Sequence, residues 1–134
     1  MSCNSSTSTE FAARLTLGPV VSGDEWDGHD FTVEVRTSAP GVTPVTWGPP
    51  DADLDAVVMQ FHTDEATLDN LLELTSAATE ITITSAADWE FSIEPVTITL
   101  PAGTYFFAIQ TEDVNGGLKT YVKGSFTVEP AGIV

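Results

Sequence analysis

Positive charge is scarce in this sequence. Its 134 residues include four Lys and Arg against twenty Asp and Glu, which gives a formal net charge of −16 at pH 7. Nucleic-acid binding depends on Lys and Arg side chains that neutralise phosphates, and adsorption to an anionic membrane needs a basic surface. Four cations cannot build either surface, so we expect neither nucleic acid nor a membrane as a partner.

Cysteine and long apolar runs are also scarce. Cys3 is the single cysteine, so no disulfide can form within the chain. No segment approaches the roughly 18 consecutive apolar residues of a membrane span. Residues 1–9 are polar and lack the cationic and apolar regions of a signal peptide. We therefore expect synthesis in the cytoplasm without a signal peptide, with residues 1–9 as a flexible N-terminal arm and 10–134 as one domain.

Helical periodicity is rare, whereas apolar and polar residues alternate with a period of two from Phe11 onward. Such alternation predicts strands with one buried face. The alternating segments are 11–17, 31–36, 57–62, 81–84, 89–93 and 104–112. Residues 63–72 offer the best helical candidate, and we allow one turn of helix there. Residues 96–100, between two prolines, are either an edge strand or a short turn.

The last third of the chain predicts a hairpin. Residues 104–112 carry apolar side chains on both faces, which predicts a central strand that is covered on both sides. Asn115-Gly116-Gly117 tolerates the positive φ of a tight turn, and Gly124 interrupts the following strand as an expected bulge. Seven to eight short strands with minimal helix predict an all-β, antiparallel β-sandwich.

Residues that could support catalysis are few. His29 and His62 are the two histidines, and no serine lies in a Gly-x-Ser-x-Gly pattern. The twenty carboxylates make chance pairs inevitable, so such pairs do not indicate a glycosidase. We expect no enzymatic activity and no cofactor.

A calcium site is weakly suggested by Asp51, Asp53 and Asp55, which imitate the start of an EF-hand loop. The glycine and glutamate that such a loop needs are replaced by Ala56 and His62. A solvated acidic loop is the favoured interpretation, so we expect no metal and keep the three aspartates as weak candidates.

Contact with another protein is the better interpretation of the aromatic residues in loops. Trp26 and Trp47 lie in the long loops 19–30 and 38–55, where exposed aromatic side chains often mark interfaces. Trp89 alternates with apolar residues and is expected in the core.

Two of the four cations lie close together near the C-terminus. Lys119, Tyr121 and Lys123 are expected on one face of the last strand. These lysines either protect an edge strand or dock on an acidic neighbour, which includes another copy of the chain.

The order of these motifs resembles a family of tailed-phage virion structural proteins with an immunoglobulin-like domain, found at the N-terminus of phage upper baseplate proteins. The resemblance covers about residues 28–129. The matching segments are Gly28–Val35, Asp53–His62, Leu71–Thr75, Trp89–Ile93, the Pro-x-Gly-x-Tyr strand Leu100–Asp113, and Lys123–Val128 after the Gly-Gly turn.

The resemblance implies an immunoglobulin-like sandwich and a non-enzymatic role in a tailed-phage virion, as a tail, baseplate, fibre-attachment or neck component. It implies other virion proteins, and further copies of this chain, as partners. A capsid decoration protein and a carbohydrate- or host-surface-binding module are the alternatives.

Overall fold

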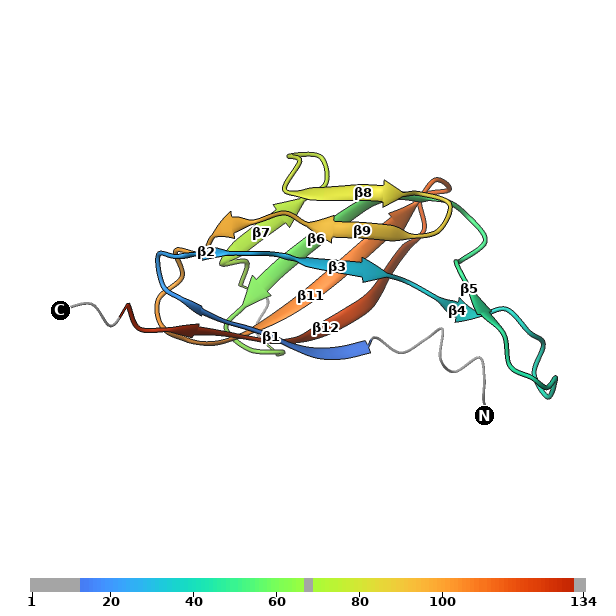
Figure 1. Cartoon of the computed structure of the whole chain (residues 1–134), viewed down its shortest axis with the longest axis horizontal. Helices are drawn as coiled ribbons and strands as arrows, with labels where there is room; N and C mark the ends of the chain where they lie inside the picture. Colours follow the sequence, from blue (N-terminus) through green and yellow to red (C-terminus); the bar gives the residue numbers. More distant parts are fainter. Residues whose placement is uncertain (1–12, 67–68, 132–134) are drawn as a thin grey trace.

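The chain folds into two stacked β-sheets, which Figure 1 shows in a computed structural model that describes residues 13–66 and 69–131. The five-stranded sheet has the order β1-β12-β11-β6-β7, and the three-stranded sheet has the order β3-β9-β8. Two short ladders pair β10 with β2 and β4 with β5. The strand bounds are β1 Ala13–Val21, β2 Glu25–Trp26, β3 His29–Thr32, β4 Val35–Arg36, β5 Trp47–Gly48, β6 Leu54–His62, β7 Leu72–Thr75, β8 Ile81–Ser85, β9 Glu90–Ile93, β10 Val96–Thr97, β11 Gly103–Asp113 and β12 Leu118–Glu129.

This architecture confirms the predicted all-β, immunoglobulin-like sandwich. All pairs of strands are antiparallel except β1 with β12, which run parallel. The expected flexible arm at residues 1–9 lies outside the described residues. That residues 10–134 form one domain stays a prediction.

No helix forms within residues 13–66 and 69–131, so the turn of helix expected in 63–72 is absent from the part of that segment that the structure describes. Instead, Thr63 donates hydrogen bonds from both its amide and its hydroxyl to the carboxylate of Asp69. These bonds join the two ends of the loop between β6 and β7. The described residues also hold no helix that is long and apolar enough to cross a membrane.

The core forms because alternate side chains of both sheets point between them. On β6, for example, Val57, Met59 and Phe61 are fully buried, as the alternation predicts. The ring of Phe126 on β12 meets the edge of Phe61 at 5.2 Å and of Trp26 at 5.0 Å between centroids, both in T-shaped geometry. Phe126 therefore joins a ring of its own five-stranded sheet to Trp26 of the short β2–β10 ladder.

The predicted hairpin of β11 and β12 is present, and the Asp113 carboxylate orders its turn. One carboxylate oxygen accepts hydrogen bonds from the amides of Asn115 and Gly117. The bulge, however, is not at Gly124. Ile109 pairs with Val122 and Gln110 with Thr120, so the extra residue is Tyr121.

Gly124 has a different role, which concerns the edge strand β1. A Cβ on Gly124 would lie 1.7 Å from the carbonyl oxygen of Leu15, an impossible contact with backbone. Glycine therefore allows β1 to approach β12 closely enough for the two strands to pair.

The prediction that β11 is covered on both faces is wrong for the described residues. Phe107, Ile109 and Thr111 are buried between the sheets, whereas Phe106 and Ala108 on the opposite face are only half-buried. Among the described residues, no second layer covers this outer face, because each sheet of a sandwich turns one face toward the core and the other face outward.

Trp89 is in the core as predicted, with a backbone that the periodicity does not reveal. Its φ of 57° is unusual for a bulky side chain, and its indole N–H donates a 2.7 Å hydrogen bond to the carbonyl of Ala52. This bond ties the start of β9 to the loop that precedes β6.

We expect Trp89→Phe to lower the free energy of unfolding by about 1–3 kcal/mol, because it removes the donor to the Ala52 carbonyl while keeping an aromatic ring. Denaturant unfolding measures the change. Trp47→Phe, at an exposed tryptophan, is the control and should change stability little. Equal effects of the two substitutions would contradict the role of this bond.

We expect Gly124→Ala to separate β1 from β12, because the added methyl group collides with the Leu15 backbone. Hydrogen exchange of β1 amides should accelerate strongly, while amides between β11 and β6 keep their protection. Ser125→Ala, at the next position of β12, serves as the control. Unchanged protection of β1 in Gly124→Ala would show that the close approach is not needed.

Candidate functional site

The structure removes Trp26 from the list of interface candidates. Its side chain is only 8% exposed, and it packs against Phe126 in the core. The surrounding loop misled the prediction, because the two-residue strand β2 is too short to show an alternating pattern. Trp47, in contrast, is 50% exposed, as the prediction requires.

The two lysines near the C-terminus lie on opposite faces of β12, so they cannot both share a face with Tyr121. The bulge at Tyr121 reverses the alternation, so that Lys119 pairs with the buried Thr111 and Lys123 with the outward Ala108. Lys123 forms a 3.2 Å ion pair with Glu65. Tyr121 packs its ring against Trp89 with 5.8 Å between centroids. The expected joint patch of these three residues is therefore absent.

The weak calcium candidates Asp51, Asp53 and Asp55 are exposed and do not form a site. In the described part of the chain, no group of three or more His, Cys, Asp or Glu side chains could hold a metal ion. Asp53 instead contributes its backbone carbonyl, which accepts a hydrogen bond from the amide of Val114.

The two histidines have structural surroundings. The ring of His29 lies 4.7 Å from that of Phe31, and Nδ1 of His62 is hydrogen-bonded to the carbonyl of Asp69. The hydrogen bonds from Thr63 to the Asp69 carboxylate lower the pKa of that group. This network closes a surface loop after β6.

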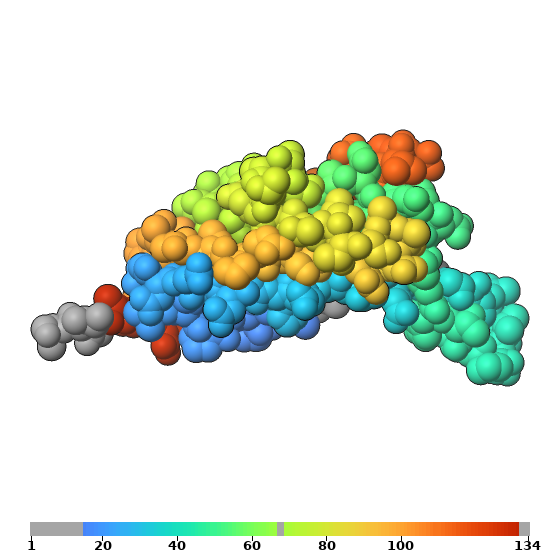
Figure 2. Space-filling view, turned by 45° about the horizontal axis from the view of Figure 1, so that its top comes forward, coloured from blue at the N-terminus to red at the C-terminus, as the bar shows by residue number. Residues whose placement is uncertain are grey.

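A hairpin that projects from one end of the sandwich is the most unusual surface feature. We define the projecting hairpin as residues 35–48, which comprise β4, β5 and the segment between them. Figures 1 and 2 show it extending beyond both sheets, in cyan and teal. The ladder pairs Val35 with Gly48 and Arg36 with Trp47.

Threonine and serine side chains stabilise the projecting hairpin. The hydroxyls of Thr37 and Thr46 are 2.8 Å apart, and the amide of Thr37 donates to the carbonyl of Thr46. The amide of Thr46 donates to the hydroxyl of Ser38 at 3.2 Å. These bonds order a segment that extends beyond the end of the sandwich.

The projecting hairpin is nearly uncharged and exposes three large apolar side chains. Val42 is 47%, Val45 41% and Trp47 50% exposed. Residues 35–50 contain no Asp or Glu and one cation, Arg36, so they carry a charge of +1 while the remaining residues carry −17. This projection therefore lacks the acidic side chains that dominate the composition of the chain.

A second exposed apolar pair lies at the same end of the sandwich. Val114 and Leu118, in and after the turn between β11 and β12, are 58% and 60% exposed. Figure 1 shows this turn and the projecting hairpin at the same end. Among the described residues, five of the six exposed large hydrophobic side chains therefore lie at this end, and only Leu71 lies elsewhere.

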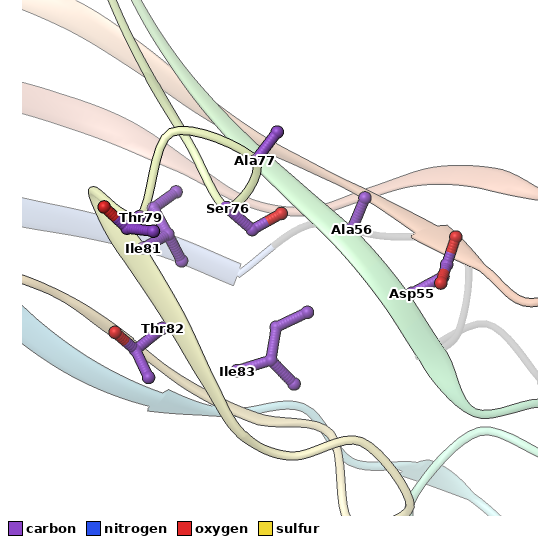
Figure 3. A pocket seen from close by; sticks show the side chains of 8 residues that line it. All are labelled: Asp55, Ala56, Ser76, Ala77, Thr79, Ile81, Thr82 and Ile83. Atoms are coloured by element: carbon purple, nitrogen blue, oxygen red, sulfur yellow. The ribbon is translucent and has the colours of Figure 1, made fainter.

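An open hollow between β6 and β8 was not predicted from the sequence. It has a volume of about 410 Å³, within the usual range of ligand sites. Figure 3 shows Ile83 lying between the two strands, with Ala56 and Asp55 on the β6 side and Ala77 on the turn above. The alternation of Ile81 and Ile83 predicted a strand but could not show that β8 lies at the edge of its sheet, beside this hollow.

Tyr121 has a raised pKa, because burial disfavours its anion and the negative charge of Asp113 adds to that effect. Its neutral form therefore stabilises the fold fully below about pH 10, and this contribution is lost as the pH rises through the raised pKa.

We expect Asp113→Asn to lower the pKa of Tyr121 only in part, because the burial remains. Ultraviolet titration in a Tyr105→Phe background measures it, and an unchanged pKa would exclude the contribution of Asp113.

Comparisons with known proteins reveal no family for this chain. No family model matches it, and no curated protein matches it. Among solved structures, the chain is similar to "The crystal structure of CopC from Methylosinus trichosporium OB3b", with 13% identity, a TM-score of 0.41, and coverage of 92% of this chain and 90% of that chain.

These comparisons correct the expected function. The solved structure that the chain is similar to is a CopC protein and not a phage virion protein. The prediction of a tailed-phage virion component is therefore wrong.

Proposed function

We propose that this chain is a non-enzymatic binding module that recognises another protein through the projecting hairpin. The observation that carries the proposal is the exposure of Trp47, Val45 and Val42 on an ordered, nearly uncharged hairpin of a strongly acidic molecule. Burial of an exposed apolar side chain by a partner stabilises the complex, by about 1.5–3 kcal/mol for a large side chain that goes from fully exposed to fully buried.

The composition of the projecting hairpin also suits recognition of a protein. Trp and Arg are the residue types most often found at the energetic centres of protein interfaces. Trp47 and Arg36 are cross-strand partners in the β4–β5 ladder, so they are adjacent on this small surface. The guanidinium of Arg36 lies within the same hairpin, 3.4 Å from the hydroxyl of Ser38 and 3.5 Å from the carbonyl oxygen of Ala39.

A carbohydrate-binding platform has less support, because it would need a row of exposed aromatic rings. Trp26 and Trp89 are both buried, which leaves Trp47 as the one exposed tryptophan. The groups described around His29 and His62 likewise support no catalytic mechanism, and this favours binding over catalysis.

The experiment identifies the partner by photo-crosslinking in the cells that naturally make this protein. A photoreactive amino acid at Val45 should crosslink to a partner protein, whereas the same residue at Leu71 should not. Leu71 is a matched control because it is comparably exposed and lies outside the projecting hairpin.

The affinity of the purified partner then tests the contribution of Trp47. We expect Trp47→Ala to weaken binding by about 30-fold or more, as for a central interface residue, and Leu71→Ala to change it little. Circular dichroism should show that both variants are folded. Crosslinks from Leu71 alone, or full affinity in Trp47→Ala, would overturn the proposal.

A further inference from the structure

Strand β8 is an unprotected edge of the three-stranded sheet. It ends the order β3-β9-β8, and its sequence Ile-Thr-Ile-Thr-Ser contains neither a charged residue nor proline. Edge strands usually carry such residues, because a free row of backbone N–H and C=O groups invites another strand to pair. By comparison, β7 at the edge of the other sheet carries Glu73.

The projecting hairpin offers a second free edge. The amide and the carbonyl of Thr46 both bond toward the β4 side, to Ser38 and Thr37. β5 comprises Trp47 and Gly48, and backbone groups of successive residues in a strand point to opposite sides, so those of Trp47 point away from β4. This side of β5 can therefore pair with another strand.

Both edges carry apolar side chains. Val45 precedes the two-residue strand β5 and is exposed, as Trp47 is. Ile81 and Ile83 are two residues apart on β8 and share a face of that strand. The hollow of about 410 Å³ adjoins β8, and Figure 3 shows Ile83 lying between β8 and β6. When a strand is added to a sheet edge, backbone pairing gives affinity and such hollows accept alternate side chains.

Charge determines which partner fits. Residues 35–50 carry +1 and the rest of each copy carries −17, so most surfaces of two copies repel each other. The projecting hairpin brings Arg36 as its single charge, and the single charged residue that lines the hollow is Asp55. These two surfaces can meet without placing like charges together.

We propose that the partner of the projecting hairpin is a second copy of this chain. In this assembly β5 of one copy adds to β8 of the next, and Val45 and Trp47 enter the hollow between β6 and β8. This inference rests on the proposed function, because it names the occupant of the same hairpin. Since two different surfaces meet, each copy keeps one of each surface free, so the contact continues into a ring or an open chain.

Mixing two variants tests this contact by analytical ultracentrifugation of the full chain. Trp47→Ala alters the projecting hairpin, and Ala77→Glu places a charge at the exposed rim of the hollow. Each variant alone should be monomeric. Their mixture should form a 1:1 dimer, because the Ala77→Glu protein supplies an intact hairpin and the Trp47→Ala protein an intact hollow.

The controls separate this contact from general effects of charge. Ala102→Glu adds the same charge at an exposed position outside the hollow and should assemble as the unaltered chain does. Assembly of the unaltered chain should strengthen with salt, because salt screens the repulsion between copies. Circular dichroism establishes that each variant is folded.

Three outcomes would overturn the inference: an unaltered chain that stays monomeric at high concentration and high salt, a mixture that stays monomeric, or assembly of Ala77→Glu equal to that of Ala102→Glu. A monomeric chain that still crosslinks through Val45 to a different protein would refute the second copy as partner and leave the proposed function standing.

Discussion

The contact of three aromatic rings, Phe126, Phe61 and Trp26, fixes the β2–β10 ladder against the five-stranded sheet. Phe126 lies on β12, Phe61 on β6 and Trp26 on β2, so the three rings connect strands that are distant in sequence. Such ring pairs add about 0.5–1.5 kcal/mol each beyond the apolar area that they bury. Because the short strand β2 precedes β3 directly, the burial of Trp26 also sets where the second sheet begins.

Period-two alternation was enough to predict the long strands and the class of fold. Val57, Met59 and Phe61 are buried as expected, because each strand has one face toward the core. The same pattern could not show the bulge at Tyr121, which depends on how β12 pairs with β11. That single residue reversed the faces of Lys119 and Lys123 and removed a predicted patch.

The candidate site was predictable only in part, for a similar reason. A long proline-containing loop with Trp47 indicated an exposed interface, and the structure places Trp47 on the surface. Trp26 in the predicted loop 19–30 is buried, because it lies on the short strand β2, which pairs with β10 beside Phe126. The hollow beside β8 depends on the order of strands in two sheets, which is a property of tertiary structure.

The projecting hairpin has a particular place in the chain. β4 follows β3 of the three-stranded sheet closely, and β5 leads into β6 of the five-stranded sheet. A mechanical load applied to the hairpin is therefore transmitted along two routes, one into each layer. Because the load divides between the two layers, neither sheet bears the whole force.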